Sequence, residues 1–166
     1  RADTTPPPTV AAVDLERYSG LWYEIARYPN SFEENCEGVT AEYTPRGDGT
    51  ITVLNTCREG APNGEARSSE GVARIVPGSN NSKLRVKFAP AWVPFAEGDY
   101  WILHLEDEYS MALVGAPSGK YLWILAREAA PDQARIPQSV QRSAGSWPEC
   151  LLVVRACRPP PCRCKT

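Results

Sequence analysis

Short stretches in which hydrophobic and polar residues alternate recur along the chain between about residue 20 and residue 127. Side chains that alternate with a period of two point to opposite faces of a β-strand, so each stretch predicts a strand with one buried face. The clearest case is the segment 83–88, where three basic residues alternate with Leu84, Val86 and Phe88. Segments rich in Gly and Pro, such as 45–49, separate the stretches and predict turns. The pattern is typical of an antiparallel sheet built from short strands.

The alternation predicts eight strands, and the chain changes character after them. Beyond residue 127, the segment 137–144 predicts a helix and the segment 150–157 predicts a short final strand. We expect a flexible leader over 1–9, one domain over 10–157 and a Cys- and Pro-rich tail over 158–166. The eight expected strands span 21–27, 39–44, 51–55, 72–76, 83–88, 99–105, 111–115 and 121–127.

The number of strands limits how the sheet can be arranged. Eight antiparallel strands leave exposed edges unless the sheet closes on itself, and closure produces a barrel. A barrel of this size is filled by side chains or holds one small ligand. A β-sandwich fits the same pattern of strands, so alternation alone leaves both all-β architectures open.

Composition and charge narrow the classes of function. A net charge of −2 gives no reason to expect a nucleic acid as partner. Six cysteines in 166 residues favour an oxidising compartment and disulfides. Because there is one histidine and the cysteines lack finger-like spacing, we expect no structural metal. No phosphate-binding Gly-rich loop, catalytic triad order or metal-binding histidine pair occurs in the sequence, so no enzymatic motif or cofactor is indicated.

Three segments decide between barrel and sandwich. Segment 14–27 contains Gly20-x-Trp22, segment 99–114 forms a predicted hairpin, and segment 121–127 ends in Arg127. In this order they resemble the three motifs of the lipocalin family, especially of its bacterial outer-membrane members and apolipoprotein D. Glu106 departs from the second motif, which usually has aspartate there. The resemblance implies an eight-stranded antiparallel up-and-down β-barrel with one C-terminal α-helix packed outside it and a short final strand.

The resemblance also implies structural roles for Gly20, Trp22 and Arg127. Gly20 lets the chain turn into the first strand without a Cβ clash. Trp22 is expected to plug the closed end of the barrel, with the Arg127 guanidinium across its indole face. These three residues are therefore expected to hold the barrel closed and not to touch a ligand.

In lipocalins that resemble this chain, cysteines equivalent to Cys36 and Cys57 form a disulfide. Strict alternation places Cys36 and Cys57 on opposite faces, so the bond requires a bulge or a strand end, and Gly38 can supply the bulge. A bond from Cys36 to a C-terminal cysteine stays open as an alternative. The pairing of the late cysteines is also open: Cys150, Cys157, Cys162 and Cys164.

The expected ligand site is the inner face of the barrel. If Arg127 points inward, alternation places Trp123 and Tyr121 on the same face. Alternation also places His104 on one face with Tyr100 and Ile102, where we interpret it as a hydrogen-bonded core residue rather than a haem ligand. The resemblance implies ligand contacts at Tyr43, Asn55, Tyr100 and Trp123. The complete expected lining is Tyr43, Val53, Asn55, Val86, Phe88, Tyr100, Ile102, Tyr121 and Trp123.

Such a lining suits a small hydrophobic ligand: a fatty acid or lysophospholipid first, then a sterol, retinoid or carotenoid. The expected function is non-catalytic binding, transport or storage by a secreted, periplasmic or outer-membrane protein. A barrel filled by its own aromatics is one alternative. Another is docking of a membrane, a protein partner or a second copy through mouth loops that contain Phe32, Trp92 and Phe95. A third is a thiol-dependent lipid-modifying enzyme, which needs a free inward-facing cysteine.

Overall fold

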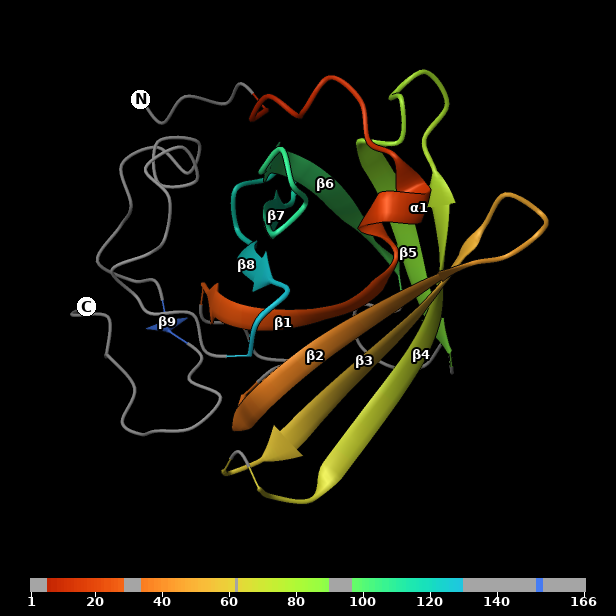
Figure 1. The fold of residues 1–166 in the computed structure, drawn as a ribbon. Coiled ribbons are helices and arrows are strands. Elements are labelled where there is room, and N and C mark those ends of the chain that lie inside the picture. Colours follow the sequence, from red (N-terminus) through yellow and green to blue (C-terminus); the bar gives the residue numbers. More distant parts are fainter. Residues whose placement is uncertain (1–5, 29–33, 62, 90–96, 130–151, 154–166) are drawn as a thin grey trace.

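The computed structural model describes residues 6–28, 34–61, 63–89, 97–129 and 152–153, and these residues form one short helix and nine β-strands (Figure 1). The helix, α1 (Leu15–Tyr18), is one turn long and is capped by the Asp14 carboxylate, which accepts from two backbone N–H groups. No helix within these ranges is long and apolar enough to cross a bilayer. The strands are β1 (Gly20–Arg27), β2 (Cys36–Pro45), β3 (Ile51–Glu59), β4 (Ala66–Ile75), β5 (Lys83–Ala89), β6 (Glu97–Leu105), β7 (Met111–Gly115), β8 (Leu122–Ala126) and β9 (Leu152–Val153).

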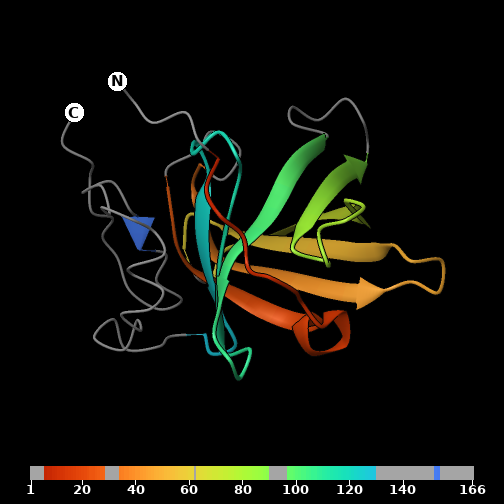
Figure 2. The same cartoon turned by 90° about the horizontal axis from the view of Figure 1, so that it is seen from above.

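The sheet closes into a barrel because β1 pairs on both of its sides. Strands β2 to β8 follow one another in chain order, β8 pairs with β1, and β1 pairs back with β2. Every pairing is antiparallel, and Figures 1 and 2 show the strands wrapping around a common interior. This confirms the eight-stranded up-and-down barrel and excludes the sandwich.

The predicted strands are confirmed, and several of them are longer than predicted, β3 and β4 most of all. β3 extends from Ile51 to Glu59 and β4 from Ala66 to Ile75, beyond the predicted ranges 51–55 and 72–76. The added part of β4 carries polar side chains toward both faces, which hides the alternation. Residues 152–153 form β9 beside the end of β1, within the predicted final strand. The predicted helix 137–144 and the four late cysteines lie outside the described residues.

Hydrophobic side chains pack on two sides of the barrel wall. Strand β7 is buried along its whole length, because one of its faces belongs to the interior and the other to an outer cluster. The interior cluster includes Trp22, Ala41, Tyr43, Val53, Leu84, Val86, Ile102, Val114 and Leu125. The outer cluster consists of Ile25, Ala26, Met111, Leu113, Leu122, Ile124 and Ala126 on β1, β7 and β8.

Three strands contain a bulge, and each bulge changes which side chains face inward. The shifts in register follow Glu24 in β1, Glu37 in β2 and Ile102 in β6. A bulge inserts an extra residue, so the alternation of faces restarts one position later.

The bulge in β2 brings the two cysteines of the β2–β3 hairpin together. Gly38 lies in it with a φ of +53°, a conformation that glycine adopts without a Cβ penalty. Cys36 and Cys57 form a disulfide with Cα atoms 5.3 Å apart. The pairing and the bulge at Gly38 are both confirmed.

The prediction that His104 shares the inner face with Tyr100 and Ile102 is wrong. The bulge after Ile102 places His104 opposite Leu113, which belongs to the outer cluster. The His104 Nε2 atom lies 3.5 Å from a carboxylate oxygen of Glu106. The ring therefore lies outside the ligand cavity.

The disulfide should contribute measurably to stability. Replacing both cysteines, Cys36→Ala with Cys57→Ala, should lower the free energy of unfolding by about 3 kcal/mol, because the unfolded chain loses a closed loop. Urea unfolding under non-oxidising, non-reducing conditions measures the change. A matched control is Thr56→Ala with Ser68→Ala, which removes an exposed hydroxyl contact of 3.2 Å between the neighbouring strands. An equal loss in both double variants would contradict a specific role for the disulfide.

Candidate functional site

One end of the barrel is sealed by Trp22 and Arg127. The Trp22 side chain is fully buried, and the Arg127 Cζ atom lies 3.9 Å from the centre of its ring. The two Nη atoms of Arg127 donate to the carbonyl oxygens of Leu21, Arg17 and Ser19 at 2.8 to 3.0 Å. Arg127 therefore ties the end of α1 to the start of β1 while covering the indole.

Gly20 joins these two elements in a conformation that requires glycine. Its φ is +96°, and a Cβ at this position would lie 3.6 Å from Nη1 of Arg127. The Trp22 Nε1–H donates a hydrogen bond of 2.8 Å to the carbonyl of Tyr18, the last residue of α1. Gly20, Trp22 and Arg127 thus close this end of the barrel through contacts with one another and with the neighbouring backbone.

The segment before α1 lies across the same end of the barrel. The Val10 N–H donates to the Ile102 carbonyl, and the Val13 N–H donates to the Asn80 carbonyl, both at 3.0 Å. Asn81 returns a side-chain hydrogen bond to the Val13 carbonyl. A contact of 3.2 Å between the hydroxyls of Thr9 and Ser82 places residue 9 against the barrel as well.

Above the seal, three tyrosine hydroxyls form a hydrogen-bonded chain. The Tyr18 and Tyr100 hydroxyls lie 2.6 Å apart, and the Tyr100 hydroxyl donates to that of Tyr43 at 2.8 Å. Burial raises the pKa of each of these tyrosines above its ordinary value. The three hydroxyls therefore stay neutral at physiological pH and satisfy one another inside an apolar region.

The closed half of the barrel is filled by side chains. A cavity beside the tyrosines, lined also by Val53, Val86 and other apolar residues, has a volume of about 10 Å³. This is room for about one water molecule. The closed half therefore has no room for a molecule of lipid size. The half nearer the β1–β2 and β5–β6 connections is called the open half below.

Two aromatic side chains stack on each other in that open half. The rings of Tyr121 and Trp123 are stacked with centroids 5.8 Å apart, and Trp123 is opposite the inward-facing Val114. Gly98 of β6 pairs with Val86 of β5, which belongs to the interior cluster. A side chain at position 98 would therefore point into the barrel. A Cβ built on Gly98 meets no heavy atom of the described residues within 4 Å.

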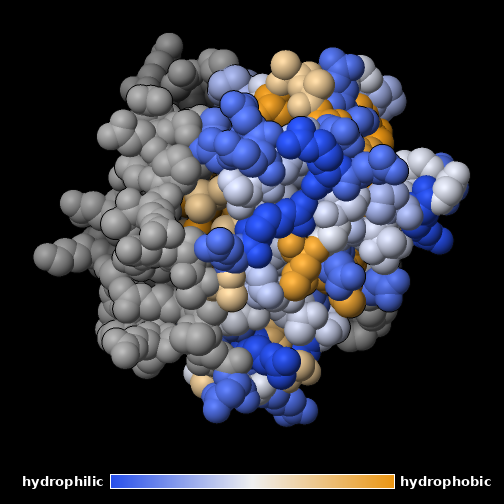
Figure 3. Space-filling model, viewed as in Figure 1, coloured by the Kyte–Doolittle hydropathy of each residue, from blue (hydrophilic) through white to orange (hydrophobic). Residues whose placement is uncertain are grey.

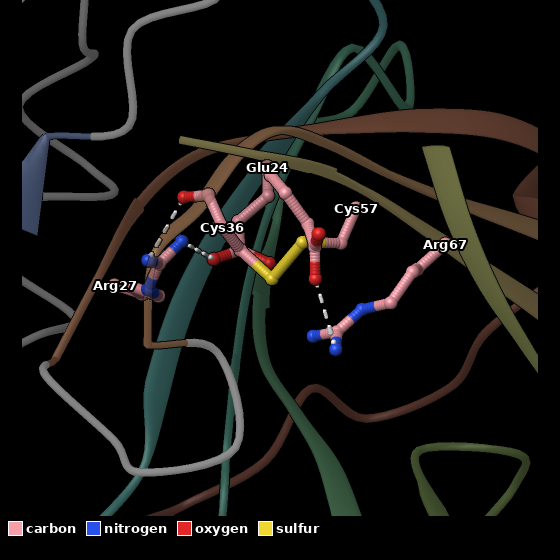
Figure 4. Close-up of a disulfide and its surroundings, with 6 residues drawn as sticks. Glu24, Arg27, Cys36, Cys57 and Arg67 are labelled. Atoms are coloured by element: carbon pink, nitrogen blue, oxygen red, sulfur yellow. Dashed lines mark hydrogen bonds and ion pairs between the residues drawn. A yellow bond between two sulfur atoms is a disulfide. The ribbon is translucent and has the colours of Figure 1, made fainter. Parts of the chain in front are cut away.

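A buried ion pair faces the same space and was missed by the sequence prediction. Nη1 of Arg27 lies 3.1 Å from Oε1 of Glu24, and both side chains are more than nine-tenths buried (Figure 4). Glu24 is opposite Leu125 and Arg27 is opposite Trp123, and both of these partners pack in the interior. Alternation from Trp22 could have placed Glu24 inside, but the bulge in β1 hides the inward direction of Arg27.

The structure brings the predicted ligand residues to one face. Asn55 is opposite the buried Ala41 of the interior cluster, so it also points inward. Contact of any of these side chains with a ligand stays a prediction. Tyr43, Val53, Val86 and Ile102 lie in the interior cluster, Phe88, Tyr100 and Trp123 pack against it, and Tyr121 stacks on Trp123.

Comparisons with known proteins agree with this geometry. The family model described as a lipocalin-like domain matches residues 13–153. Temperature-induced lipocalin-1 of Arabidopsis thaliana is 42% identical over 139 residues, which cover 81% of this chain and 73% of that protein. The chain belongs to the lipocalin family. The resemblance of its three motifs is thereby confirmed.

Further relatives of this lipocalin come from bacteria and animals. Outer membrane lipoprotein Blc of Vibrio cholerae is 38% identical over 135 residues, covering 81% of this chain and 76% of that protein. Apolipoprotein D of Rattus norvegicus is 37% identical over 129 residues, covering 73% and 64%. Japanin from Rhipicephalus appendiculatus, solved with bound cholesterol, has the same fold with a TM-score of 0.61 and 16% identity, covering 89% of this chain and 97% of that one. Members of the family bind small hydrophobic ligands.

The tyrosine chain gives this lipocalin a distinct stability profile at alkaline pH. A tyrosine whose pKa is raised in the folded state adds stability that is complete below its unfolded pKa of about 10 and is lost as pH rises above it. Tyr100→Phe should lower the free energy of unfolding at pH 7 by about 1–3 kcal/mol, because two buried hydroxyls lose a partner. It should also make the decline of stability above about pH 10 less steep, since one ionising group is gone.

Urea unfolding between pH 7 and pH 11 measures both effects. Tyr23→Phe is the control, because Tyr23 is opposite Ala126 on the outer side of the barrel. It should change stability by less than about 0.5 kcal/mol at any of these pH values. An alkaline slope that is identical in Tyr100→Phe and the parent protein would contradict the neutral hydrogen-bonded chain.

Proposed function

We propose that this lipocalin holds one small hydrophobic ligand in the open half of its barrel and carries or stores it without transforming it. The observation that supports this most directly is the contrast between the two halves of the interior. The closed half is sealed by Trp22 and Arg127 and has no room for a lipid. In the open half Tyr121 and Trp123 stack, and a Cβ at Gly98 would meet no heavy atom of the described residues within 4 Å. An apolar cavity with one open end is the usual form of a small-molecule site.

The apolar lining is sufficient to bind such a ligand. A ligand that buries about 400 Å² of apolar surface gains about 10 kcal/mol at about 25 cal/mol per Å². Association costs of at least about 4 kcal/mol leave about 6 kcal/mol, which corresponds to a Kd in the range of tens of micromolar. Long-chain fatty acids and lysophospholipids, and also sterols and retinoids, have enough apolar surface. The cholesterol in the Japanin structure supports this range of ligands.

The state of the described cysteines supports a carrier over an enzyme. A cysteine-dependent lipocalin enzyme needs an inward-facing thiolate as nucleophile. Cys36 and Cys57 are bonded to each other, so neither provides a thiolate in the oxidised protein. The disulfide and the outer-membrane lipoprotein among the relatives also support placing this protein in an oxidising compartment, such as the periplasm or the extracellular space.

Docking of a membrane or a second copy receives less support from the described surface. On the face seen in Figure 3, the described residues form a mainly hydrophilic surface with small separate hydrophobic patches. Among the described residues Leu21 is the exposed large hydrophobic side chain, at 41% of its full exposure. The aromatic residues expected at the mouth, Phe32, Trp92 and Phe95, lie outside the described residues.

Filling the open half should abolish binding. Gly98→Phe adds a ring where a Cβ meets open space, so we expect a normal fold and an affinity for retinol at least about tenfold lower. Quenching of tryptophan fluorescence by retinol measures the affinity, and thermal unfolding checks the fold. Gly47→Phe is the matched control: Gly47 lies in the β2–β3 turn at the sealed end, also with open space, and should bind retinol normally. Unchanged retinol binding in Gly98→Phe would refute the proposed location.

The ligand itself can be identified without a variant. Native mass spectrometry of freshly purified protein, followed by organic extraction, should reveal a retained fatty acid, lysophospholipid or other lipid. A bare mass, together with failure to bind fatty-acid and retinoid probes, would point to a filled barrel instead.

A further inference from the structure

The three buried tyrosine hydroxyls contain one hydrogen-bond donor more than they use. Each hydroxyl has a single proton, and the chain has two links, from Tyr18 to Tyr100 and from Tyr100 to Tyr43. Because Tyr100 gives its proton to Tyr43, it accepts from Tyr18. The proton of the Tyr43 hydroxyl is therefore left over, and no group in the described parts of the chain accepts it.

Tyr43 borders a cavity that can hold a partner for this donor. The cavity is lined by all three tyrosines and by apolar side chains of α1, β3, β4 and β5, and its volume is about 10 Å³. That volume admits about one atom of the size of a water oxygen. Ser19, the remaining polar residue of the lining, donates its hydroxyl proton to the Leu15 carbonyl. The cavity thus has room for one acceptor atom next to a hydroxyl whose proton no described residue accepts.

This cavity adjoins the half of the barrel proposed to hold the ligand. Its lining includes Val86, and the cross-strand partner of Val86 is Gly98 of the open half. Val53 also belongs to the lining, and the next inward-facing residue of β3 is Asn55. A ligand that lies beside Gly98 and extends toward the seal therefore reaches the cavity with its inner end.

We propose that the Tyr43 hydroxyl donates a hydrogen bond to a neutral oxygen, a hydroxyl or a carbonyl, at the inner end of the ligand. This inference rests on the proposed carrier function and adds an orientation and a chemical class to it. The apolar body of the ligand lies in the open half, and its oxygen atom occupies the cavity beside the tyrosines. Among the ligand classes considered above, this arrangement favours sterols and retinols over fatty acids and lysophospholipids.

The surroundings of Tyr43 disfavour an anion at the same place. Burial raises the pKa of Tyr43, and the Glu24 carboxylate raises it further, so this part of the interior opposes negative charge. The Arg127 guanidinium acts in the opposite direction, but its Nη atoms are bound to three backbone carbonyls. A carboxylate would lose its hydration and gain one hydrogen bond from a neutral donor, which does not compensate for the loss.

A trapped water in the cavity makes a different prediction. It would accept the Tyr43 proton whether or not a ligand is bound, so an oxygen on the ligand would not change the affinity. Ratios of affinity separate the two cases, because a change in stability cancels when two ligands with the same apolar body are compared on one protein.

The experiment measures the binding of retinol and three analogues to the full chain at neutral pH by tryptophan quenching. The analogues are retinoic acid, retinyl acetate and axerophthene, in which a hydrogen atom replaces the retinol hydroxyl. We expect retinol to bind about tenfold more tightly than axerophthene, because the hydrocarbon leaves a buried donor without a partner. Retinoic acid should bind at least about tenfold more weakly than retinol, since its carboxylate is ionised. Retinyl acetate should also bind about tenfold more weakly, because the cavity has no room for the acetyl group.

Substitutions at the two ends of the hydrogen-bond chain test its direction. Tyr43→Phe should reduce the preference for retinol over axerophthene to less than about threefold, because the spare proton then belongs to Tyr100, whose oxygen lies 2.8 Å farther along the chain. Tyr18→Phe also removes one hydroxyl but leaves the Tyr43 donor, so the ratio should stay within about twofold of the wild-type value. The control is Tyr23→Phe on the outer side of the barrel, which should leave all four affinities unchanged. Thermal unfolding checks the fold of each variant.

Three results would overturn the inference. Equal wild-type affinities for retinol and axerophthene would assign the Tyr43 proton to a water and leave the carrier function intact, even if no variant folds. Binding of retinyl acetate or retinoic acid as tight as that of retinol would place the oxygen of the ligand at the open end instead. A preference that survives in Tyr43→Phe would exclude Tyr43 as its source. Failure of wild-type protein to bind any of the four retinoids would instead contradict the proposed function itself.

Discussion

Strand β1 closes the sheet into a barrel, and it also determines which side chains form part of the interior wall. Its first residues pair with β2 and its later residues pair with β8, so both edges of the sheet meet on one strand. The bulge after Glu24 lies within the pairing to β8. That bulge turns Ile25 and Ala26 toward the outer cluster and returns Arg27 to the interior. Closure and the chemistry of the cavity wall are therefore consequences of the same eight residues.

Polar groups inside the barrel are paired within the protein at three levels along its axis. At the sealed end Arg127 donates hydrogen bonds to two backbone carbonyls at the C-terminal end of α1. Carbonyls at a helix end have no partner within the helix. In the middle the hydroxyls of Tyr18, Tyr43 and Tyr100 bind one another. Near the open end Glu24 and Arg27 neutralise each other. Polarity thus changes from neutral hydroxyls to full charges along the barrel axis.

The sequence was sufficient to predict the fold and most of the lining, because strand alternation and local motifs are short-range signals. Leu84, Val86 and Phe88 point inward as the period of two requires, and Trp22 meets Arg127 as the family resemblance implies. Bulges were the main source of error. The extra residue of a bulge does not change the hydrophobic pattern of the sequence in a recognisable way. His104 was therefore predicted on the inner face of the barrel, and the inward direction of Arg27 was missed. The bulge in β2 was predictable only because Gly38 and the cysteine pair required it.

The two halves of the barrel are held together by different means. In the sealed half the cluster around Trp22 fills the space, and burial of apolar surface stabilises the walls. The open half has a smaller hydrophobic cluster, formed by Cys36, Val39 and Cys57. There β3 and β4 carry polar side chains such as Thr56 and Ser68, and the Cys36–Cys57 disulfide links β2 to β3. A covalent link constrains the unfolded chain, so it stabilises this end of the barrel without adding side chains to the interior.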